Sequence, residues 1–283
     1  MDTRIVPVLV VAALGLAACG SDSDSPAAGD SLPPVVDGYQ HPTGADEVVI
    51  EYAEVGGFMP REFAFRQTPN VLISGDGRSF SPGAQIEIYP GPLLPVVQVW
   101  SIGEDGIQQA LAAADEAGLF QEIDYEQPTN IADASTAQVT INVNGETHVH
   151  SAYALGMGGA PGDGAAAATP ERQALADFID ELTALASPGP SGDPDIFEPS
   201  DYGIEAQVVD DLSAYGTDGI EPTVVDWPAD AGLRLADAAT CAVVSAAEVG
   251  DTLLAANQLT FFSDADITYQ VFAKPMLPGT DCG

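Results

Sequence analysis

One pentapeptide, Glu146-Thr147-His148-Val149-His150, carries the residue types and spacing best suited to chemistry in this chain. Residues two apart on a β-strand share one face, so Glu146, His148 and His150 are expected to project together. Two imidazoles and a carboxylate are typical ligands of zinc or a similar divalent cation. The spacing therefore predicts a metal site at these three residues, and a divalent cation is the one cofactor that the sequence suggests.

The register of the surrounding hairpin decides whether these histidines are exposed. A two-residue loop at Asn144-Gly145 would pair His148 with Ile141 and His150 with Val139, and both imidazoles would then lie on the apolar face. A three-residue loop that begins one residue earlier, with a glycine bulge, would leave the histidines over polar neighbours. We favour the longer loop. It makes the pair accessible to a metal, and it is equally compatible with an ordinary solvated strand face.

Well-understood catalytic signatures do not occur in the sequence. We find no Gly-x-Ser-x-Gly elbow, no His-Glu-x-x-His zinc motif, no Cys-x-x-Cys pair and no phosphate-binding loop. No activated serine or cysteine can be assigned to a histidine acting as a base. The sequence therefore favours a binding protein over an enzyme, and a metal-dependent envelope hydrolase that uses His148 and His150 is the alternative.

Other polar and aromatic residues give weaker signals. Asp76, Asp133 and the acidic run over residues 193–201 could hold calcium, but none of them follows the twelve-residue spacing of a calcium loop, so solvated loops are favoured. Trp100 and Trp227 could be platforms for a sugar, although buried aromatic residues at strand ends are the favoured interpretation.

The start of the chain has the pattern of a secretory signal. Arg4 precedes an apolar run that is too short for a permanent membrane-spanning helix. The run ends in Leu16-Ala17-Ala18-Cys19, which resembles the lipobox of bacterial lipoproteins. This resemblance implies removal of residues 1–18, lipidation of Cys19 with acyl chains such as palmitate, and an anchor on the extracytoplasmic side of the cell membrane. An ordinary secreted protein, cut at an Ala-x-Ala-like site, is the alternative.

Residues 19–45 are expected to form the lipidated N-terminus and a flexible stalk, because Gly, Ser, Asp, Pro and Ala dominate the segment and leave little to bury. The region after the stalk is similar in style to uncharacterised acidic lipoproteins of high-GC Gram-positive bacteria. That similarity implies no functional residues.

The charge of the chain is strongly negative, with 43 acidic against 7 basic Lys and Arg residues and a net charge of −36. Such a surface repels nucleic-acid phosphates and anionic lipid headgroups, so nucleic-acid binding is disfavoured. A solvated acidic surface is the favoured interpretation, and capture of a cation or a basic partner is the alternative.

Two cysteines remain once Cys19 carries lipid. Cys241 and Cys282 form an even pair in an oxidising compartment, which predicts a disulfide. Two free thiols, able to bind a metal, are the alternative. The bond would connect the C-terminal tail to the second half of the protein.

Hydrophobic periodicity predicts an α+β fold of antiparallel β-sheets with about three helices. Helices are expected after Ser101 and Ser245, which both have capping-box spacing, and after Thr169-Pro170. Strands are expected over residues 47–55, 63–65, 70–74, 85–89, 96–100, 138–144, 146–155, 204–209, 223–227, 259–262 and 267–272.

The expected organisation is an N-terminal α+β half over residues 46–160, a helix and acidic Pro-rich connection over 161–203, and a C-terminal α+β half with the disulfide over 204–283. Both halves contain a helix followed by a hairpin, which suggests two similar halves. The favoured function is an interaction module for a small ligand or another envelope protein, in an oligomeric state that the sequence leaves open. An exposed apolar patch or groove is the feature that this function requires.

Overall fold

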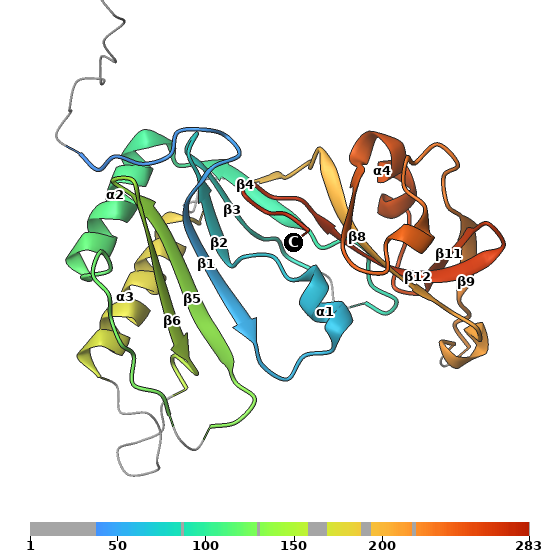
Figure 1. Ribbon diagram of the computed structural model, residues 1–283, viewed down its shortest axis with the longest axis horizontal. Helices are drawn as coiled ribbons and strands as arrows, with labels where there is room; N and C mark the ends of the chain where they lie inside the picture. The colour runs from blue at the N-terminus through green and yellow to red at the C-terminus, as the bar shows by residue number, and fades with distance from the viewer. Residues whose placement is uncertain are drawn as a thin grey trace, which may run out of the picture. The chain divides into compact units, whose positions relative to one another are not determined.

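The α+β prediction is confirmed, because the described part of the chain holds twelve strands and four α-helices (Figure 1). The computed structural model describes residues 38–85, 88–128, 131–157, 169–187, 194–216 and 219–282, so the lipobox with Cys19 lies outside it. The strands form two sheets, one of seven strands and one of five. No helix in these ranges is long and apolar enough to cross a membrane.

The first sheet is antiparallel throughout and has the order β6-β5-β1-β2-β3-β4-β7. Its strands are β1 (Val48–Gly56), β2 (Val71–Ser74), β3 (Arg78–Pro82), β4 (Val97–Ser101), β5 (Ser135–Val143), β6 (Glu146–Tyr153) and β7 (Asp195–Ile196). Every second side chain of β5 is buried, from Ala137 to Val143. This alternation gives the sheet one apolar face, which must be covered.

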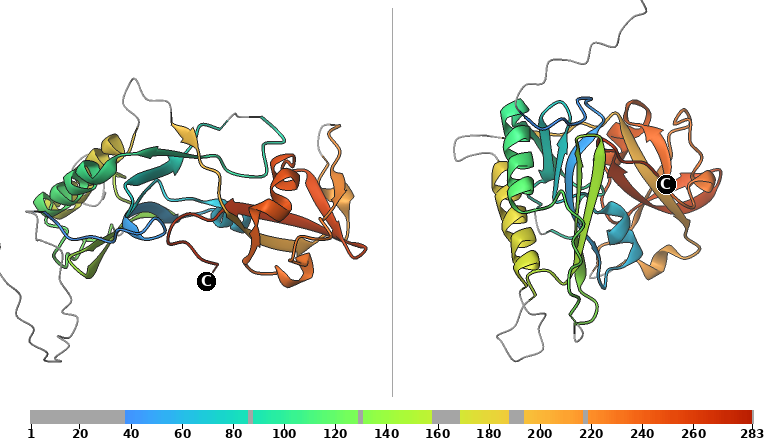
Figure 2. Two further views of the ribbon diagram at one scale, coloured as in Figure 1. Left: turned by 90° about the horizontal axis from the view of Figure 1, so that it is seen from above. Right: turned by 60° about the vertical axis from the view of Figure 1, so that its left-hand side comes forward.

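Two helices cover that face, α2 (Gly103–Glu116) and α3 (Pro170–Leu185), and they lie side by side against the β5–β6 end of the sheet (Figure 2). Each helix presents an apolar stripe with helical spacing, which includes Ile107 and Leu111 on α2 and Leu175 on α3. These side chains share one core cluster with β1 and β5. The hydrophobic residues chosen from the sequence therefore do pack into a core.

The helix boundaries agree with the sequence except at the start of α2. Thr169 caps α3, since its hydroxyl accepts from the amide of Arg172 at 3.3 Å, and Gly118 ends the segment after α2 with a φ of 75°. Ser101 closes β4 instead of capping α2, whose N-cap is Ile102 without a side-chain bond. The predicted capping box at Ser101 is therefore wrong.

The second sheet has the order β10-β8-β12-β11-β9, in which only β9 and β11 run parallel. Its strands are β8 (Asp201–Val208), β9 (Thr223–Asp226), β10 (Ala242–Ser245), β11 (Thr260–Asp264) and β12 (Ile267–Pro275), with helix α4 (Ala246–Leu254) and 3-10 turns η1 (Leu212–Ala214) and η2 (Leu235–Asp237). Leu253 of α4 packs with Phe262 of β11 in its core. A hairpin follows a helix in both sheets, but their strand orders differ.

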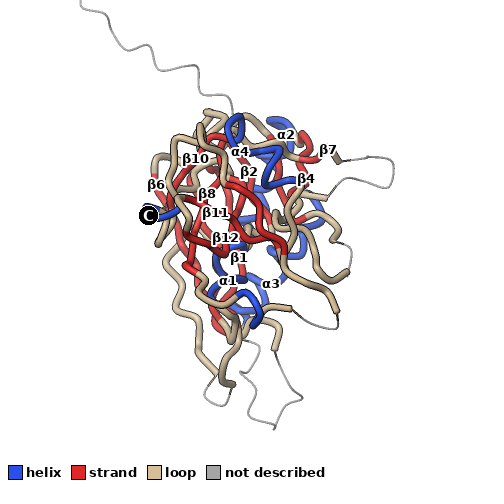
Figure 3. The backbone as a smooth tube through the Cα atoms, turned by 90° about the vertical axis from the view of Figure 1, so that its right-hand side faces the viewer, coloured by secondary structure: helices blue, strands red, loops and turns tan. Residues whose placement is uncertain are grey.

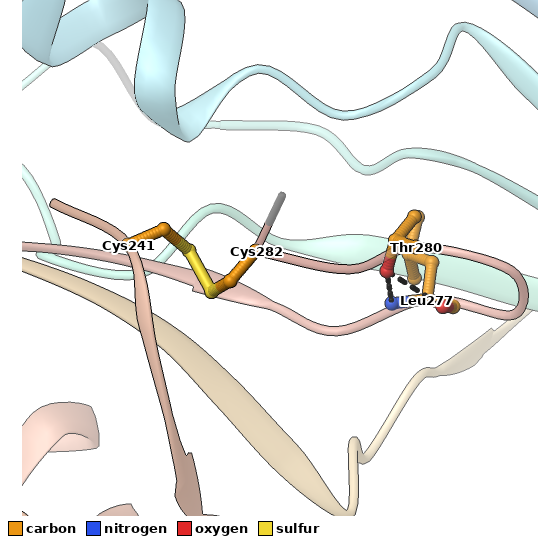
Figure 4. The surroundings of a disulfide bond; sticks show 4 residues. All are labelled: Cys241, Leu277, Thr280 and Cys282. Carbon is orange, nitrogen blue, oxygen red and sulfur yellow. Dashed lines mark hydrogen bonds between the residues drawn. A yellow bond between two sulfur atoms is a disulfide. The ribbon is translucent and has the colours of Figure 1, made fainter.

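The predicted disulfide is confirmed, since Cys241 and Cys282 are bonded (Figure 4). The tail before Cys282 turns at Leu277, whose amide donates a hydrogen bond to Thr280 Oγ1 at 2.8 Å. Leu277 packs with Phe80 in a core cluster of the first sheet. Closing a loop of 41 residues adds about 4 kcal/mol to the free energy of unfolding in the chain-entropy model. The bond also keeps the C-terminal tail in its position between the two sheets.

The segment after β1 is the main error in the predicted elements. Phe63 and Phe65 alternate with other residues and predict a strand, yet they lie in the short helix α1 (Arg61–Arg66), as shown in Figure 1 and Figure 3. Residues 85, 88 and 89 form no strand either. β3, β7 and β10 are strands that the sequence did not predict. These elements are short, and their pairing with neighbours outweighs local pattern.

Ordered contacts begin before the expected end of the stalk at residue 45. The amide of Tyr39 donates to Gln108 Oε1 at 2.8 Å, and its hydroxyl donates to Asp115 at 2.8 Å. The ring of Tyr39 also packs edge-on against Phe120, with centroids 5.6 Å apart. The segment from Tyr39 is therefore part of the folded body.

Candidate functional site

The β5–β6 hairpin has the two-residue turn that the sequence analysis did not favour. Asn144 and Gly145 have φ values of 53° and 79°, as a type I′ turn requires. His150 consequently pairs with Val139, and His148 pairs with Ile141. A change of one residue in register moves every side chain to the opposite face, so this correction decides what the two imidazoles contact.

His150 of β6 is buried against the segment that follows α2 and is 2% exposed. Its Nε2 lies 2.8 Å from the carbonyl oxygen of Leu119, and its Nδ1 lies 3.0 Å from the hydroxyl of Tyr125. A neutral imidazole carries one proton, and it must lie on Nε2 because only a protonated nitrogen can donate to the Leu119 carbonyl. The unprotonated Nδ1 therefore accepts from the hydroxyl of Tyr125. Burial lowers the pKa of His150, and burial also raises the pKa of Tyr125 to about 12. The pair is therefore neutral, and neither ring nitrogen is left for a metal.

The other two predicted ligands do not form a site. The ring of His148 stacks on Phe120 with centroids 5.6 Å apart. Its Nε2 lies 3.9 Å from the carboxylate of Glu146, whose side chain is 77% exposed. No group of three or more His, Cys, Asp or Glu side chains within the described ranges could hold a metal ion. The predicted metal site at Glu146, His148 and His150 is wrong, because the shorter turn directs His150 into the core.

Asp76 and the two tryptophans have structural roles. Asp76 accepts from the hydroxyl of Ser74 at 2.6 Å and from Arg78 Nε at 2.7 Å, and so closes the turn between β2 and β3. Trp227 is 6% exposed and donates to the carbonyl of Leu233 at 2.8 Å. Trp100 packs against the core of the first sheet. The prediction of a buried aromatic residue is confirmed for Trp227, whereas Trp100 is only partly buried.

A groove lies where α1 and the segments over residues 82–85 and 88–96 meet β12. It consists of two adjoining cavities of about 480 and 190 Å³ that share Phe63, Arg66 and Gln258 as lining residues. Cavities of a few hundred cubic ångströms are typical of small-ligand sites. We refer to these two cavities together as the α1 groove.

Ionic and cation–π contacts hold α1 against the second sheet. Arg61 Nη2 lies 3.1 Å from a carboxylate oxygen of the buried Glu205 on β8. One turn further along the helix, Lys274 Nζ of β12 lies 5.1 Å from the centre of the Phe65 ring. Six residues are too few for a stable helix by themselves, so these contacts keep one wall of the groove in place.

Backbone bonds fix the opposite wall. Three prolines, at positions 90, 92 and 95, keep the segment over residues 88–96 out of the sheet ladder, since proline lacks an amide hydrogen. The amide of Leu93 donates to the carbonyl of Ala256 at 3.1 Å. Gly91 and Gln258 exchange two bonds, one from the Gln258 amide at 2.9 Å and one to the Gln258 side chain at 3.0 Å. One wall is thus tied to β8 and β12, and the other to the loop between α4 and β11.

Large apolar side chains are unusually exposed along this groove. Phe63 is 51% exposed, Tyr89 53% and Ile88 56%, and Met59 also lines the groove. Phe58, at 91% exposure, lies just before α1 but lines neither cavity. A cluster of exposed apolar side chains is a recognised mark of a binding surface. This is the feature that an interaction module requires.

Sequence reasoning missed the groove because its residue types are ordinary and come from separate parts of the chain. A run with two phenylalanines near a Pro-rich segment was visible in the sequence. The alternation of Phe63 and Phe65 concealed the helix that places Phe63 and Arg66 together. The contact of that helix with β12 joins residues about two hundred positions apart, and no local pattern reveals it.

The chain matches no protein-family model, no curated protein and no solved structure. The function is therefore inferred from the groove and from the features of the sequence.

Proposed function

We propose that the protein is a lipid-anchored extracytoplasmic binding protein whose ligand occupies the α1 groove. The observation that carries this proposal is the combination of exposed Phe63, Ile88 and Tyr89 with a wall held by Arg61 and Glu205. Exposed apolar surface is costly in water, and a bound ligand removes it from water. A preformed groove also binds with a smaller entropic penalty than a surface that must be ordered first.

The proposed anchor is Cys19, and the proposed location is the extracytoplasmic face of the cell membrane. The Leu16-Ala17-Ala18-Cys19 sequence supports it, and so does the Cys241–Cys282 disulfide, which is typical of an oxidising compartment. The net charge of −36 keeps nucleic acids from being plausible partners. A small ligand fits the cavity volumes better than a protein partner does.

The alternative of a metal-dependent hydrolase requires His148 and His150 as metal ligands, and His150 is not available. His150 donates to a backbone carbonyl and accepts from Tyr125, both within the core. A metal could reach its ring only after the core had opened. We therefore do not carry this alternative further.

A ligand screen by thermal unfolding tests the binding function. A compound that binds the native state raises the melting temperature, and the rise grows with the logarithm of the ratio of its concentration to its dissociation constant. We expect hits with the full-length protein that are lost in Phe63→Ala and kept in Phe58→Ala, since Phe58 is exposed and lies outside both cavities. Hits that Phe63→Ala retains in full would place binding elsewhere and contradict the proposal.

Metabolic labelling tests the anchor separately. Cells that express the protein with a labelled palmitate analogue are expected to label the wild type in the membrane fraction. Cys19→Ser is expected to remain unlabelled and to be released in soluble form or retained as an uncut precursor. Equal labelling of both proteins would show that Cys19 is not the lipidated residue.

A further inference from the structure

Arg66 differs from the other basic residues that the structure describes. Each of the others has a defined partner: Arg61 with Glu205, Arg78 with Asp76, Arg234 with Asp264, Arg172 with three backbone carbonyls, and Lys274 with the ring of Phe65. Arg66 forms no ion pair with any described residue. In a chain with 43 acidic residues, a guanidinium without a carboxylate is conspicuous.

The hydrogen bonds of Arg66 are also incomplete. A guanidinium has five N–H donors, yet within the described chain only Nη2 donates, to the carbonyl of Pro92 at 3.1 Å. The Nε atom is buried and has no acceptor there. A partly buried cation in this condition is expected to bind an external acceptor. Burial also lowers the pKa of Arg66, as it does for a cation that lacks a counterion.

The smaller cavity has Arg66 among its lining residues and is mainly apolar. Phe63, Tyr89, Leu93 and Phe272 line it, and its volume is about 190 Å³. An engineered apolar cavity of about 150 Å³ is known to hold one benzene molecule. The cavity therefore has room for a single ring or a branched aliphatic group, with a guanidinium beside it.

We propose that the ligand of the α1 groove is a carboxylic acid with an apolar group of about phenyl size. Its carboxylate binds the guanidinium of Arg66, and its apolar group enters the cavity beside Phe63. This inference rests on the proposed binding function and names the chemical class of its ligand. The pairing satisfies the guanidinium and covers the exposed rings at the same time.

The larger cavity contacts the part of the ligand that lies beyond the carboxylate and the apolar group. Its polar lining includes the side chains of Gln67, Thr68 and Asn70. Side-chain amides can donate to and accept from a peptide backbone. The carboxylate could therefore come from a free apolar acid or from the C-terminus of a peptide that continues along the larger cavity. The two sources share the same contacts at Arg66.

Calorimetric titration of the full-length protein, in a detergent that carries no carboxylate, tests this inference. The probes are 3-phenylpropionate, N-acetylphenylalanine and N-acetylphenylalanine amide. The amide has the same apolar group without the charge, so we expect it to bind at least about tenfold more weakly than the acid, as loss of a charged hydrogen bond predicts. Binding of both acids identifies free acids as ligands, and binding of N-acetylphenylalanine alone identifies peptide C-termini. Either result supports the shared chemistry.

Matched variants assign the contacts. Arg66→Gln is expected to abolish the difference between acid and amide, whereas Arg234→Gln, an exposed arginine paired with Asp264, is expected to preserve it. Phe63→Ala is expected to weaken binding of the acids and of the amide by about tenfold, and Phe58→Ala is expected to have no effect. Circular dichroism of each variant ensures that a loss of binding is not a loss of fold.

The failures are distinguishable. Equal affinity for acid and amide, or discrimination that survives Arg66→Gln, would overturn the carboxylate inference. Binding of a neutral trisaccharide that depends on Phe63, with no binding of the acids, would overturn it while the proposed function stands. If neither these probes nor the compounds of the thermal screen bind, the binding function itself fails.

Discussion

The β5–β6 hairpin and the α1 groove use polar residues in opposite ways. In the hairpin, His150 is buried and both of its ring nitrogens have partners in the protein. In the groove, Arg66 has one hydrogen bond to a described residue, and Phe63 and Tyr89 are half exposed. The hairpin has residue types suited to chemistry, but the hydrogen-bonding groups of its buried histidine all have partners. The groove has ordinary residue types, but some of their donors and apolar surfaces have no partner in the described chain.

The comparison shows that residue type is a weaker sign of function than unsatisfied bonding capacity. An imidazole whose two nitrogens are paired within the core contributes to stability, because a lost partner would leave a buried polar atom alone. A guanidinium and exposed rings without partners lower stability unless something binds them. Substitutions in the two regions should therefore affect different measurements.

The largest expected effect is the loss of stability in His150→Ala. The variant removes a buried ring and leaves both the Tyr125 hydroxyl and the Leu119 carbonyl without their partner, which we expect to cost about 3 kcal/mol. Phe63→Ala, at a half-exposed position, is expected to cost less than about 1 kcal/mol. Urea unfolding of the two variants measures the difference. An equal loss in both would remove the distinction between the two regions.

The next effect concerns the wall of the groove. Arg61→Ala leaves the carboxylate of Glu205 buried without its ion pair, although Gln207 still donates to it at 3.2 Å. Since Arg61 is itself well exposed, we expect the free energy of unfolding to fall by only about 1–2 kcal/mol. Ligand binding should also weaken, because α1 loses a contact with β8. Arg61→Lys keeps the charge and is expected to retain most of both. Full binding in Arg61→Ala would show that α1 does not depend on this pair.

A smaller effect is expected on acidification. Burial lowers the pKa of His150 in the folded state, with a contribution from the neighbouring His148. The unfolded chain then binds the proton more readily, near the ordinary value of about 6.5. The associated stability is fully present above that pH and is lost as the pH falls through it towards the lowered folded pKa.

Urea unfolding between pH 8 and pH 5 measures this loss. His150→Gln stays neutral and can still donate and accept, and it should show a flatter pH profile than the wild type. His41 and His148 are present in both proteins, so the difference between the two profiles belongs to His150. Parallel profiles would mean that this ring does not resist protonation.

The smallest effect is expected at Glu146. Its side chain is 77% exposed, and Glu146→Gln should change the free energy of unfolding by less than about 0.5 kcal/mol. Zinc titration followed by calorimetry should also give the same heats for this variant and the wild type. Zinc binding that the variant loses would restore the hairpin as a site and reverse the comparison.

The elements with clear local signals were predictable from the sequence. Thr169-Pro170 begins α3, alternation defines β5, and the cysteine count gives the Cys241–Cys282 pair. Long periodic segments specify their own structure because burial of one face dominates their energy.

The site was not predictable, for two physical reasons. The two possible loops at Asn144-Gly145 differ by one residue, and the choice between them depends on whether the core can satisfy His150. The sequence did not reveal that Tyr125 and the Leu119 carbonyl would meet that ring. The groove depends on the contact of α1 with β12, and such long-range packing is set by tertiary structure.

The most direct test of the account is hydrogen–deuterium exchange of the full-length protein with and without N-acetylphenylalanine. A ligand in the α1 groove should slow exchange of amides over residues 58–70 and 88–96, which form its two walls. Exchange over residues 135–153, in the β5–β6 hairpin, should not change. Slower exchange in the hairpin without any change in the groove would contradict the central claim that the groove is the functional site.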